Sequence, residues 1–168
     1  MSDYIGNDNL MSRISDLQKR LEILERTSRV ATLTGVTGVA TQAIATAESR
    51  SSTSWGDLAT VGPEVTVDVG PSGQLLVILF CQAYYTASAA VACMTFALSG
   101  ANTAVASDEN QLQILSSVYS PGGRLAVAVD LDEGPTTVTA KYQTDTSAYG
   151  GGARNIDYKN RQITAFPL

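Results

Sequence analysis

Five apolar residues near the start of the chain recur at a 4-3-4-3 spacing and constrain the fold more than any other feature. They are Leu10, Ile14, Leu17, Leu21 and Leu24. This heptad spacing places them along one side of an α-helix, which we expect to run from about Asn9 to Arg29 because no Gly or Pro interrupts it. A helix cannot bury such a stripe against itself, so the seam predicts partner chains.

Charged residues beside the seam indicate how many partners there are. With Leu17 and Leu24 at d positions and Leu21 at a, Arg20 falls at g and Glu25 at the following e, where the two can pair across chains. The stretch from Arg20 to Glu25 also resembles a short pattern known from trimeric coiled coils. We therefore expect three identical, parallel helices, and the alternative is an amphipathic helix packed on its own domain. The expected oligomerisation residues are Leu10, Ile14, Leu17, Arg20, Leu21, Leu24 and Glu25.

An uncharged segment, Val30–Ala47, follows the seam and consists mostly of Ala, Thr, Val and Gly. Gly disfavours a helix, whereas Thr and Val favour extended backbone. We interpret this segment as a neck whose small side chains pack against the other chains, with an internal strand of the next domain as the alternative. The expected organisation is a stem at 1–29, a neck at 30–47 and a head at 48–168.

The remainder of the chain has the pattern of an all-β domain, in which short apolar or alternating runs are separated by turn residues. Leu75–Cys81 is apolar at every position, which predicts a central strand covered on one side by the core and on the other by a neighbour. Seven or eight antiparallel strands in about 120 residues suit a jelly-roll-like sandwich. The expected strands are Glu64–Val69, Gln74–Thr86, Val91–Leu98, Gln111–Tyr119, Arg124–Leu131, Thr136–Gln143 and Arg161–Phe166, with Asn155–Lys159 a weaker candidate.

The chain has no histidine, which excludes Ser-His-Asp and Cys-His catalysis and removes the commonest metal ligand. It also lacks a P-loop and a GxGxxG motif. The densest acidic cluster is Asp130, Asp132 and Glu133. Its spacing does not fit an EF-hand, so a solvated hairpin end is favoured over a calcium site. We therefore expect no enzyme activity, no cofactor and no catalytic or metal-binding residues.

Two cysteines, Cys81 and Cys93, lie symmetrically about Ala87. A hairpin centred there would place them opposite each other, which leaves a cross-strand disulfide as one option. Two buried free thiols are the favoured prediction, because cytoplasmic assembly keeps thiols reduced.

The charge pattern restricts the partners of the chain. Charged residues make up 16% of the sequence, against about a quarter in an average soluble domain, so we expect surface to be buried between subunits. The net charge is −5, and the acidic excess lies after residue 29, which argues against nucleic-acid binding. The seven-residue run Leu75–Cys81 is too short to span a membrane, which takes about 20 residues, and the first residues do not resemble a signal peptide.

Two aromatic residues are candidate exposed contacts. Trp55 sits in Ser54-Trp55-Gly56-Asp57-Leu58, and a lone Trp beside a turn is more often a packing anchor than a sugar platform. Tyr149 precedes Gly150-Gly151-Gly152, so we expect it at an exposed tip.

A family resemblance is carried by the segment around Ala47–Val69. A Ser/Thr-rich strand is followed by the turn Trp55-Gly56-Asp57-Leu58-Ala59, then by Gly62-Pro63 and an alternating Val/Thr strand. The pattern continues through the apolar run Leu75–Cys81 and ends in Asn160–Leu168, a basic-to-apolar strand. Together these features resemble small virion proteins of tailed phages that infect actinobacteria, and the resemblance covers about 120 residues.

That resemblance implies a homotrimer with an N-terminal coiled coil and a β-sandwich head, of the minor tail, fibre or capsid-decoration type. It implies a structural protein of the virion, assembled in the host cytoplasm, whose stem contacts other virion proteins of the capsid or tail. It brings no catalytic residues. The alternative hypothesis is a carbohydrate-binding module that adheres to glycans of the host cell wall, for which Trp55 and Tyr149 are the candidate contacts. We expect neither nucleic acid nor membrane as a partner.

Overall fold

The computed structural model describes residues 18–19, 38–85, 90–115, 118–145 and 155–168. The chain divides into two compact units, Met1–Gly35 and Val36–Leu168. In the first unit only Gln18 and Lys19 are described, and both have helical backbone. The expected coiled coil and its seam residues, Leu10, Ile14, Leu17, Arg20, Leu21, Leu24 and Glu25, lie outside the described residues.

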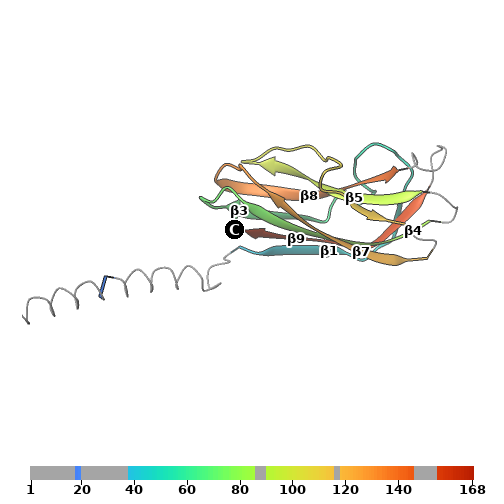
Figure 1. Ribbon diagram of the computed structural model, residues 1–168. Helices are drawn as coiled ribbons and strands as arrows, with labels where there is room; N and C mark the ends of the chain where they lie inside the picture. Colours follow the sequence, from blue (N-terminus) through green and yellow to red (C-terminus); the bar gives the residue numbers. More distant parts are fainter. Residues whose placement is uncertain (1–17, 20–37, 86–89, 116–117, 146–154) are drawn as a thin grey trace, which may run out of the picture. The chain divides into compact units, whose positions relative to one another are not determined.

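The second unit, which we call the head, is built from antiparallel β-strands (Figure 1). One sheet has the order β1-β9-β4-β7, with β2 also paired to β9, and the other has the order β3-β8-β5-β6. Each sheet combines strands from both halves of the chain, as in a double-sheet jelly roll. The expectation of a mainly β sandwich is thus confirmed. The strands are β1 (Ala40–Ile44), β2 (Glu48–Arg50), β3 (Glu64–Val69), β4 (Leu75–Tyr85), β5 (Val91–Gly100), β6 (Leu112–Ile114), β7 (Ser120–Ala128), β8 (Gly134–Asp145) and β9 (Ile156–Pro167).

Most of these strands lie where the sequence pattern predicts them. The bounds of β3 agree with the prediction, and β4 lies between β9 and β7 as a central strand. The two C-terminal candidates are one strand, β9, whose pairing with β4 is interrupted by a register shift at Phe80/Gln82. At this bulge Asn160 adopts a positive φ of 49°, a conformation that Asn tolerates better than most residues.

Part of the segment expected to be a neck belongs to the head. Residues Ala40–Ile44 form β1, which pairs with β9 from Ala40↔Ala165 to Ile44↔Arg161. The head therefore begins before Glu48, the boundary that the sequence suggested. The charge-free segment contains Thr, which favours extended backbone, so its composition suits an edge strand as well as a neck. Its partner strand β9 lies more than 100 residues further along the chain, where no local pattern indicates the pairing.

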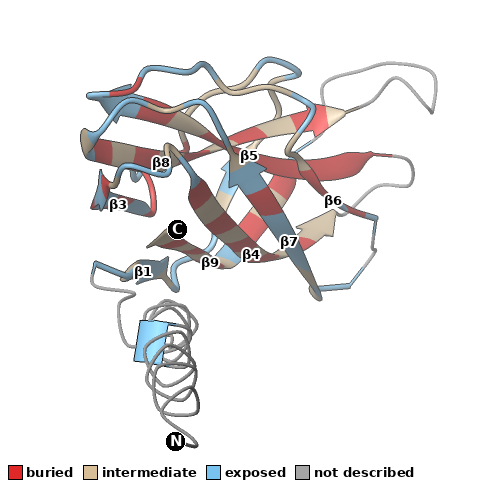
Figure 2. Ribbon diagram, turned by 60° about the vertical axis from the view of Figure 1, so that its left-hand side comes forward, coloured by how far each residue is buried: buried red, intermediate tan, exposed pale blue. Residues whose placement is uncertain are grey.

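The core lies between the two sheets and follows the alternation of the strands (Figure 2). On β4 the odd-numbered residues from Leu75 to Ala83 are buried, while the even-numbered ones are only half-buried. Burying one Leu or Val side chain contributes about 1.5–3 kcal/mol, so inward-facing residues such as Leu79 and Val138, both 0% exposed, dominate the stability of the head.

The head has two distinct ends. At one end β1 begins, beside the pairs Leu75↔Pro167 and Gly100↔Thr136. At the other end lie the pairs Tyr85↔Ile156 and Val91↔Asp145, whose residues flank segments 86–89 and 146–154 (Figure 1). The chain thus enters the β-sandwich at the end opposite to the pairs Tyr85↔Ile156 and Val91↔Asp145.

The loop Asn102–Asn110 runs along the outside of the four-stranded sheet. Its start is fixed by the Asn102 side chain, which donates to the Asp132 carbonyl at 2.8 Å. Ala104 then pairs with Leu98 of β5, and Asp108 reaches the Trp55 indole. Asn102 and Leu98 hold the loop against its own sheet, so it does not project.

Candidate functional site

A buried ion pair links two strands of the five-stranded sheet. The Arg161 side chain is fully buried on β9, and its Nη1 lies 3.4 Å from Oε2 of Glu48 on β2. Its Nη2 donates to the Thr46 carbonyl at 3.4 Å, and its guanidinium lies 5.6 Å from the ring centroid of Tyr142. Glu48 also accepts hydrogen bonds from the backbone and side chain of Thr60. Arg161 is fully buried, whereas Glu48 is half-buried and Thr60 is exposed, so the ion pair lies at the edge of the core and fastens β2 to β9.

A second buried polar group joins the two sheets. The hydroxyl of Tyr158 on β9 donates to the carbonyl of Gln143 on β8 at 2.6 Å and accepts from the N–H of Cys93 on β5 at 3.2 Å. Burial raises the pKa of the Tyr158 phenol well above its ordinary value, so it stays protonated and keeps donating. Its ring packs edge-on against Tyr142, with 5.0 Å between the centroids. These tyrosines are therefore structural.

The turn that carries Trp55 is fastened over the outer side of the four-stranded sheet. Arg50 donates to the carbonyls of Ser54 and Asp57, at 2.7 Å in each case, and so holds both sides of the turn. Gly56 exchanges backbone hydrogen bonds with Tyr142 of β8. A Cβ at Gly56 would lie 2.6 Å from Arg50 Nη2, so a larger residue there would displace the end of the Arg50 side chain from this turn.

Trp55 lines an open groove of about 410 Å³ beside the loop of residues 103–106. Its indole N–H donates to Oδ1 of Asp108 at 3.0 Å, and the Gln143 amide donates to the same oxygen at 3.1 Å. Lys141 also lines the groove and is paired with Asp57 at 2.7 Å. A half-buried aromatic ring beside hydrogen-bonding groups is an arrangement that can hold a small polar ligand such as a sugar.

A second hollow, of about 460 Å³, lies between the β5–β6 loop and β7. It is lined mainly by polar residues, including Asp108, Glu109, Gln111 and Arg124. Arg124 Nη2 donates to the Glu109 carbonyl at 3.3 Å across it. This contact ties β7 to the loop and needs no ligand to explain it.

The described residues contain no group of three or more His, Cys, Asp and Glu side chains arranged to hold a metal ion. Within the same residues, no helix is both long and apolar enough to span a membrane. At the acidic cluster, the N–H of Asp132 donates to Oδ1 of Asn102 at 2.8 Å, and Asp130 adopts a positive φ of 57°. Asp132 is therefore anchored by its backbone, at a turn between β7 and β8.

Uncharged side chains cover the outer side of the five-stranded sheet from Leu76 to Phe80 of β4 and at the positions paired with them. Directly paired residues of antiparallel strands share a face, and the pairing gives three outward rows. The rows are Phe166–Leu76–Val127, Thr41–Thr164–Ile78–Leu125 and Ala43–Gln162–Phe80–Gly123. We call this set of residues the apolar face. Leu125 is 60% exposed and Val127 is 44% exposed, whereas Leu76, Ile78, Phe80 and Phe166 are half-buried.

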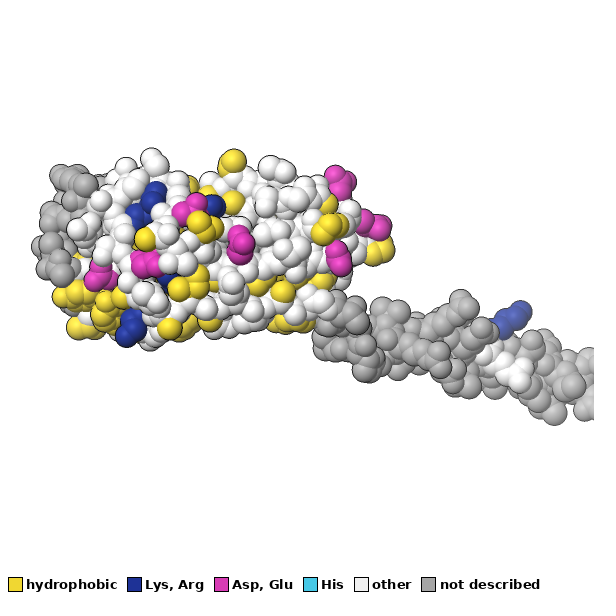
Figure 3. Space-filling view, turned by 180° about the vertical axis from the view of Figure 1, so that it is seen from behind, with side chains coloured by type: hydrophobic (Ala, Val, Ile, Leu, Met, Phe, Trp, Pro, Cys, Tyr) yellow, Lys and Arg dark blue, Asp and Glu magenta, His cyan; other side chains and the backbone are white. Residues whose placement is uncertain are grey.

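The opposite side of the head has a different character. On β3 the outward residues are Glu64, Thr66 and Asp68, all exposed, and on β8 they include Thr137 and Lys141. Thr66 and Thr137 share a hydrogen bond of 2.8 Å between their hydroxyls. In the space-filling view from behind, hydrophobic side chains gather along the border of the head on the side of the five-stranded sheet (Figure 3). The two sheets thus present one polar and one apolar outer surface.

The sequence-predicted site residues fall into two groups. Trp55 lies in the groove, and its indole contact with Asp108 fits the packing-anchor interpretation. Tyr149 and the seam residues lie outside the described residues. The exposed apolar residues of β7 were not predicted as a site. The sequence does contain a signal for them, the alternation at Leu125-Ala126-Val127. The small Ala126 is buried, and the two larger side chains lie on the other face of the sheet.

Both cysteines are buried and unpaired, as the favoured prediction had it. Cys81 lies on β4 in one sheet and Cys93 on β5 in the other, so the strands do not form the hairpin that would oppose them. Burial raises the pKa of each thiol to about 12. The thiols are therefore inert packing groups at neutral pH.

Comparison with known proteins shows no family for this chain. No family model matches it. No curated protein matches it either. Among solved structures, it is similar to Eiger, a TNF from S. frugiperda, at 10% identity and a TM-score of 0.40, over 78% of this chain and 85% of that one. A likeness at this level carries no conclusion about what the chain binds.

Proposed function

We propose that this chain is a non-enzymatic structural protein of a phage virion: a homotrimeric fibre, spike or decoration protein that projects from the particle. In this proposal the N-terminal stem registers three copies and contacts capsid or tail proteins, and the β-sandwich head forms the outer part.

The observation that carries the proposal is the two-ended construction of the head. The chain enters at Ala40, and the pairs Tyr85↔Ile156 and Val91↔Asp145 lie at the opposite end. A head built this way suits a projecting part, with one end leading to an attachment segment and the other free for contacts. The heptad seam and the resemblance to actinobacteriophage virion proteins agree with this reading.

Three carboxylates of the head are engaged by neighbouring side chains, which supports a structural role for them. Glu48 is engaged by Arg161, Asp57 by Lys141, and Asp108 accepts from Trp55 and Gln143. General acid–base catalysis needs a carboxyl or imidazole within reach of a substrate, whereas these carboxylates bind neighbouring side chains.

Sedimentation of the full chain tests the oligomeric state, and we expect a trimer at micromolar concentration. Leu17→Asp would place an unpaired charge in the seam three times per trimer and should weaken association. Ser12→Asp adds the same charge at an outward heptad position and serves as the control. A wild-type monomer, or equal behaviour of the two variants, would contradict the proposal.

Immunogold labelling of intact virions tests the location. We expect label on the particle surface, and its position distinguishes a capsid decorator from a tail fibre. Particles that carry no label, from cells that express the protein, would show that it is not a virion component.

Adhesion to host wall glycans is a second candidate function, favoured by the groove beside Trp55. Repetition in a trimer would turn a weak site into useful avidity. We expect purified cell-wall glycan to bind the full chain, with loss of binding in Trp55→Ala and partial retention in Trp55→Phe, which keeps a ring but loses the indole donor. Thr66→Ala, at an exposed position of β3 outside the groove, is the control. Binding that is unaffected by Trp55→Ala would exclude this site.

A further inference from the structure

We propose that the apolar face on β1-β9-β4-β7 is the contact surface between the heads of identical copies of this chain, arranged about a three-fold axis. The inference rests on the proposed homotrimer and goes beyond it by naming the surface that holds the heads together.

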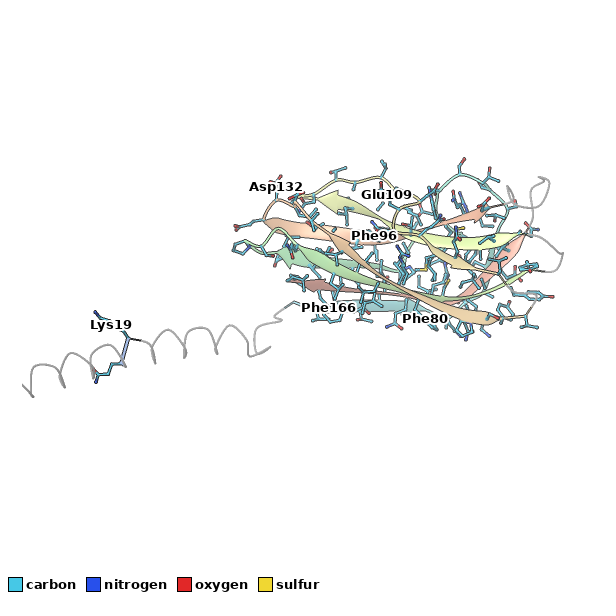
Figure 4. The ribbon with its side chains drawn as sticks, viewed as in Figure 1. Lys19, Phe80, Phe96, Glu109, Asp132 and Phe166 are labelled. Atoms are coloured by element: carbon cyan, nitrogen blue, oxygen red, sulfur yellow. The ribbon has the colours of Figure 1, made fainter. Side chains whose placement is uncertain are left out.

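Exposure is the first observation. Leu125 and Val127 on β7 are 60% and 44% exposed, and Val129, just beyond the strand, is 53% exposed. Leu125 and Val127 lie directly beside Ile78 and Leu76 of β4, so these exposed residues are continuous with a half-buried apolar strand. Phe80 and Phe166 extend the same surface toward its two ends, whereas Phe96 belongs to the other sheet (Figure 4). Contiguous patches of this kind mark interaction sites, whereas scattered apolar residues do not.

Charge is the second observation, and it favours a second copy over an unrelated partner. None of the side chains in the three rows of the apolar face carries a charge. Identical chains bring identical charges, so a surface that meets its own copy avoids like-charge repulsion most simply by having none. Glu64, Asp68 and Lys141 lie on the opposite sheet, and on the five-stranded sheet Lys159 and Asp157 lie beyond the three rows.

The route of the chain is the third observation. β1 is the first strand after the predicted seam, and it lies at the edge of the sheet that carries the apolar face. Fifteen residues separate Leu24 from Ala40. A stem that gathers three copies therefore leads directly into this sheet in each of them, and it raises the local concentration of the three faces.

The symmetry determines which parts of the face meet. A three-fold contact is heterologous, so different halves of the surface touch across each interface. We place Leu125 and Val127 of one copy against the β1–β9 half of the next, where Thr41 and Phe166 lie. The three rows span four strands about 4.8 Å apart and about five residues long, roughly 320 Å² in plan. A standard interface buries about 800 Å² per partner, so the face forms the centre of the contact and the residues around it must contribute the rest.

Polar and charged groups border the face at one end. Lys159 pairs with Gln82 and Asp157 with Tyr84 beyond the bulge, and Lys159 lies 5.6 Å from the ring centroid of Tyr119. The Tyr84 and Tyr119 rings are 5.2 Å apart. An apolar centre with an aromatic and charged margin is the usual construction of a protein interface.

Thiol labelling of the full-length trimer tests the surface without disrupting it. Val127→Cys places a thiol in the face, and Thr66→Cys places one at an exposed position of the opposite sheet. Cys81 and Cys93 are buried and serve as a silent background. We expect the thiol from Val127→Cys to react with maleimide at least about ten-fold more slowly than the thiol from Thr66→Cys. Equal rates in a trimer would overturn the inference.

A charge substitution measures what the face contributes. Leu125→Arg should raise the dissociation constant of the trimer by about 30-fold or more, the effect of losing an interface hot spot, while Thr66→Arg leaves it within about three-fold. Circular dichroism of both variants checks that the head remains folded. If the stem alone keeps the three copies together, adding Leu125→Arg to Val127→Cys must still make the new thiol react freely with maleimide. A thiol that stays protected in that double variant would also overturn the inference.

The outcomes separate this inference from the proposed function. A trimer in which the thiol from Val127→Cys is not protected would support the homotrimer and contradict the apolar face as its contact surface. Association that survives Leu17→Asp but is lost when Leu125→Arg is added supports the face and removes the seam as the source of assembly. A wild-type monomer removes both.

Discussion

The guanidinium of Arg161 lies 3.4 Å from the Glu48 carboxylate and joins the centre of β9 to the short strand β2. The Arg161 side chain is fully buried, and neither its Nε nor its Nη1 makes a hydrogen bond within the described residues, although Nη1 lies within ion-pair distance of Glu48. Glu48 and the Thr46 carbonyl therefore provide most of the compensation for a buried positive charge.

Replacement of Glu48 by Gln should destabilise the head markedly. The substitution leaves the buried charge of Arg161 without a counter-ion, which we expect to lower the free energy of unfolding by about 2–4 kcal/mol. Chemical denaturation of the full chain measures the change. Glu64→Gln, an exposed carboxylate on β3, is the matched control and should shift stability by less than about 0.5 kcal/mol. Equal effects would show that the ion pair contributes little.

The same carboxylate should make stability depend on pH in the acid range. Partial burial raises the pKa of Glu48, but the hydrogen bonds from Thr60 and the charge of Arg161 outweigh it and lower the pKa below its ordinary value of 4.5. The unfolded state then binds more protons, so this contribution is complete above pH 4.5 and is lost as the pH falls through the folded-state pKa. Melting temperatures of wild type and Glu48→Gln between pH 2.5 and 7 should converge on the acid side; a constant difference would contradict this.

Removal of the Tyr158 hydroxyl should loosen the contact between the sheets. Tyr158→Phe eliminates the bond to the Gln143 carbonyl and leaves buried backbone groups of β5 and β8 without this partner, at a cost of about 1–3 kcal/mol. Tyr84→Phe, on the outer side of β4, should cost less than about 0.5 kcal/mol. Thermal unfolding compares the two, and a neutral Tyr158→Phe would show that the hydrogen bond adds no net stability.

Both thiols should be unreactive in the folded head. Cys81 and Cys93 are buried, and burial raises the pKa of each to about 12, so the thiolate is scarce at pH 8. We expect iodoacetamide to modify them only after denaturation, as intact-mass measurement would show. Rapid native labelling of either cysteine would mean that the head opens locally around β4 or β5.

Much of the head could be predicted from short-range pattern. The alternation at Glu64–Val69 predicted β3 with its bounds, and the apolar run at Leu75–Cys81 predicted a central strand, which is β4. Such predictions succeed because side chains alternate between two faces with a period of two. The site prediction was more limited: Trp55 was selected as the lone Trp beside a turn, but its partner Asp108 lies 53 residues away and no local pattern connects them.

The sequence by itself determined the β character of the head, most of its strands and the lack of imidazole chemistry, because these follow from local periodicity and residue type. Only the tertiary structure decided that Ala40–Ile44 pairs with β9, that Arg161 is buried against Glu48, and that Leu125 and Val127 lie beside Ile78 and Leu76. These relationships join residues far apart in the chain. The pairing of strands across two sheets selects them, and a period-two pattern does not specify which strands become neighbours.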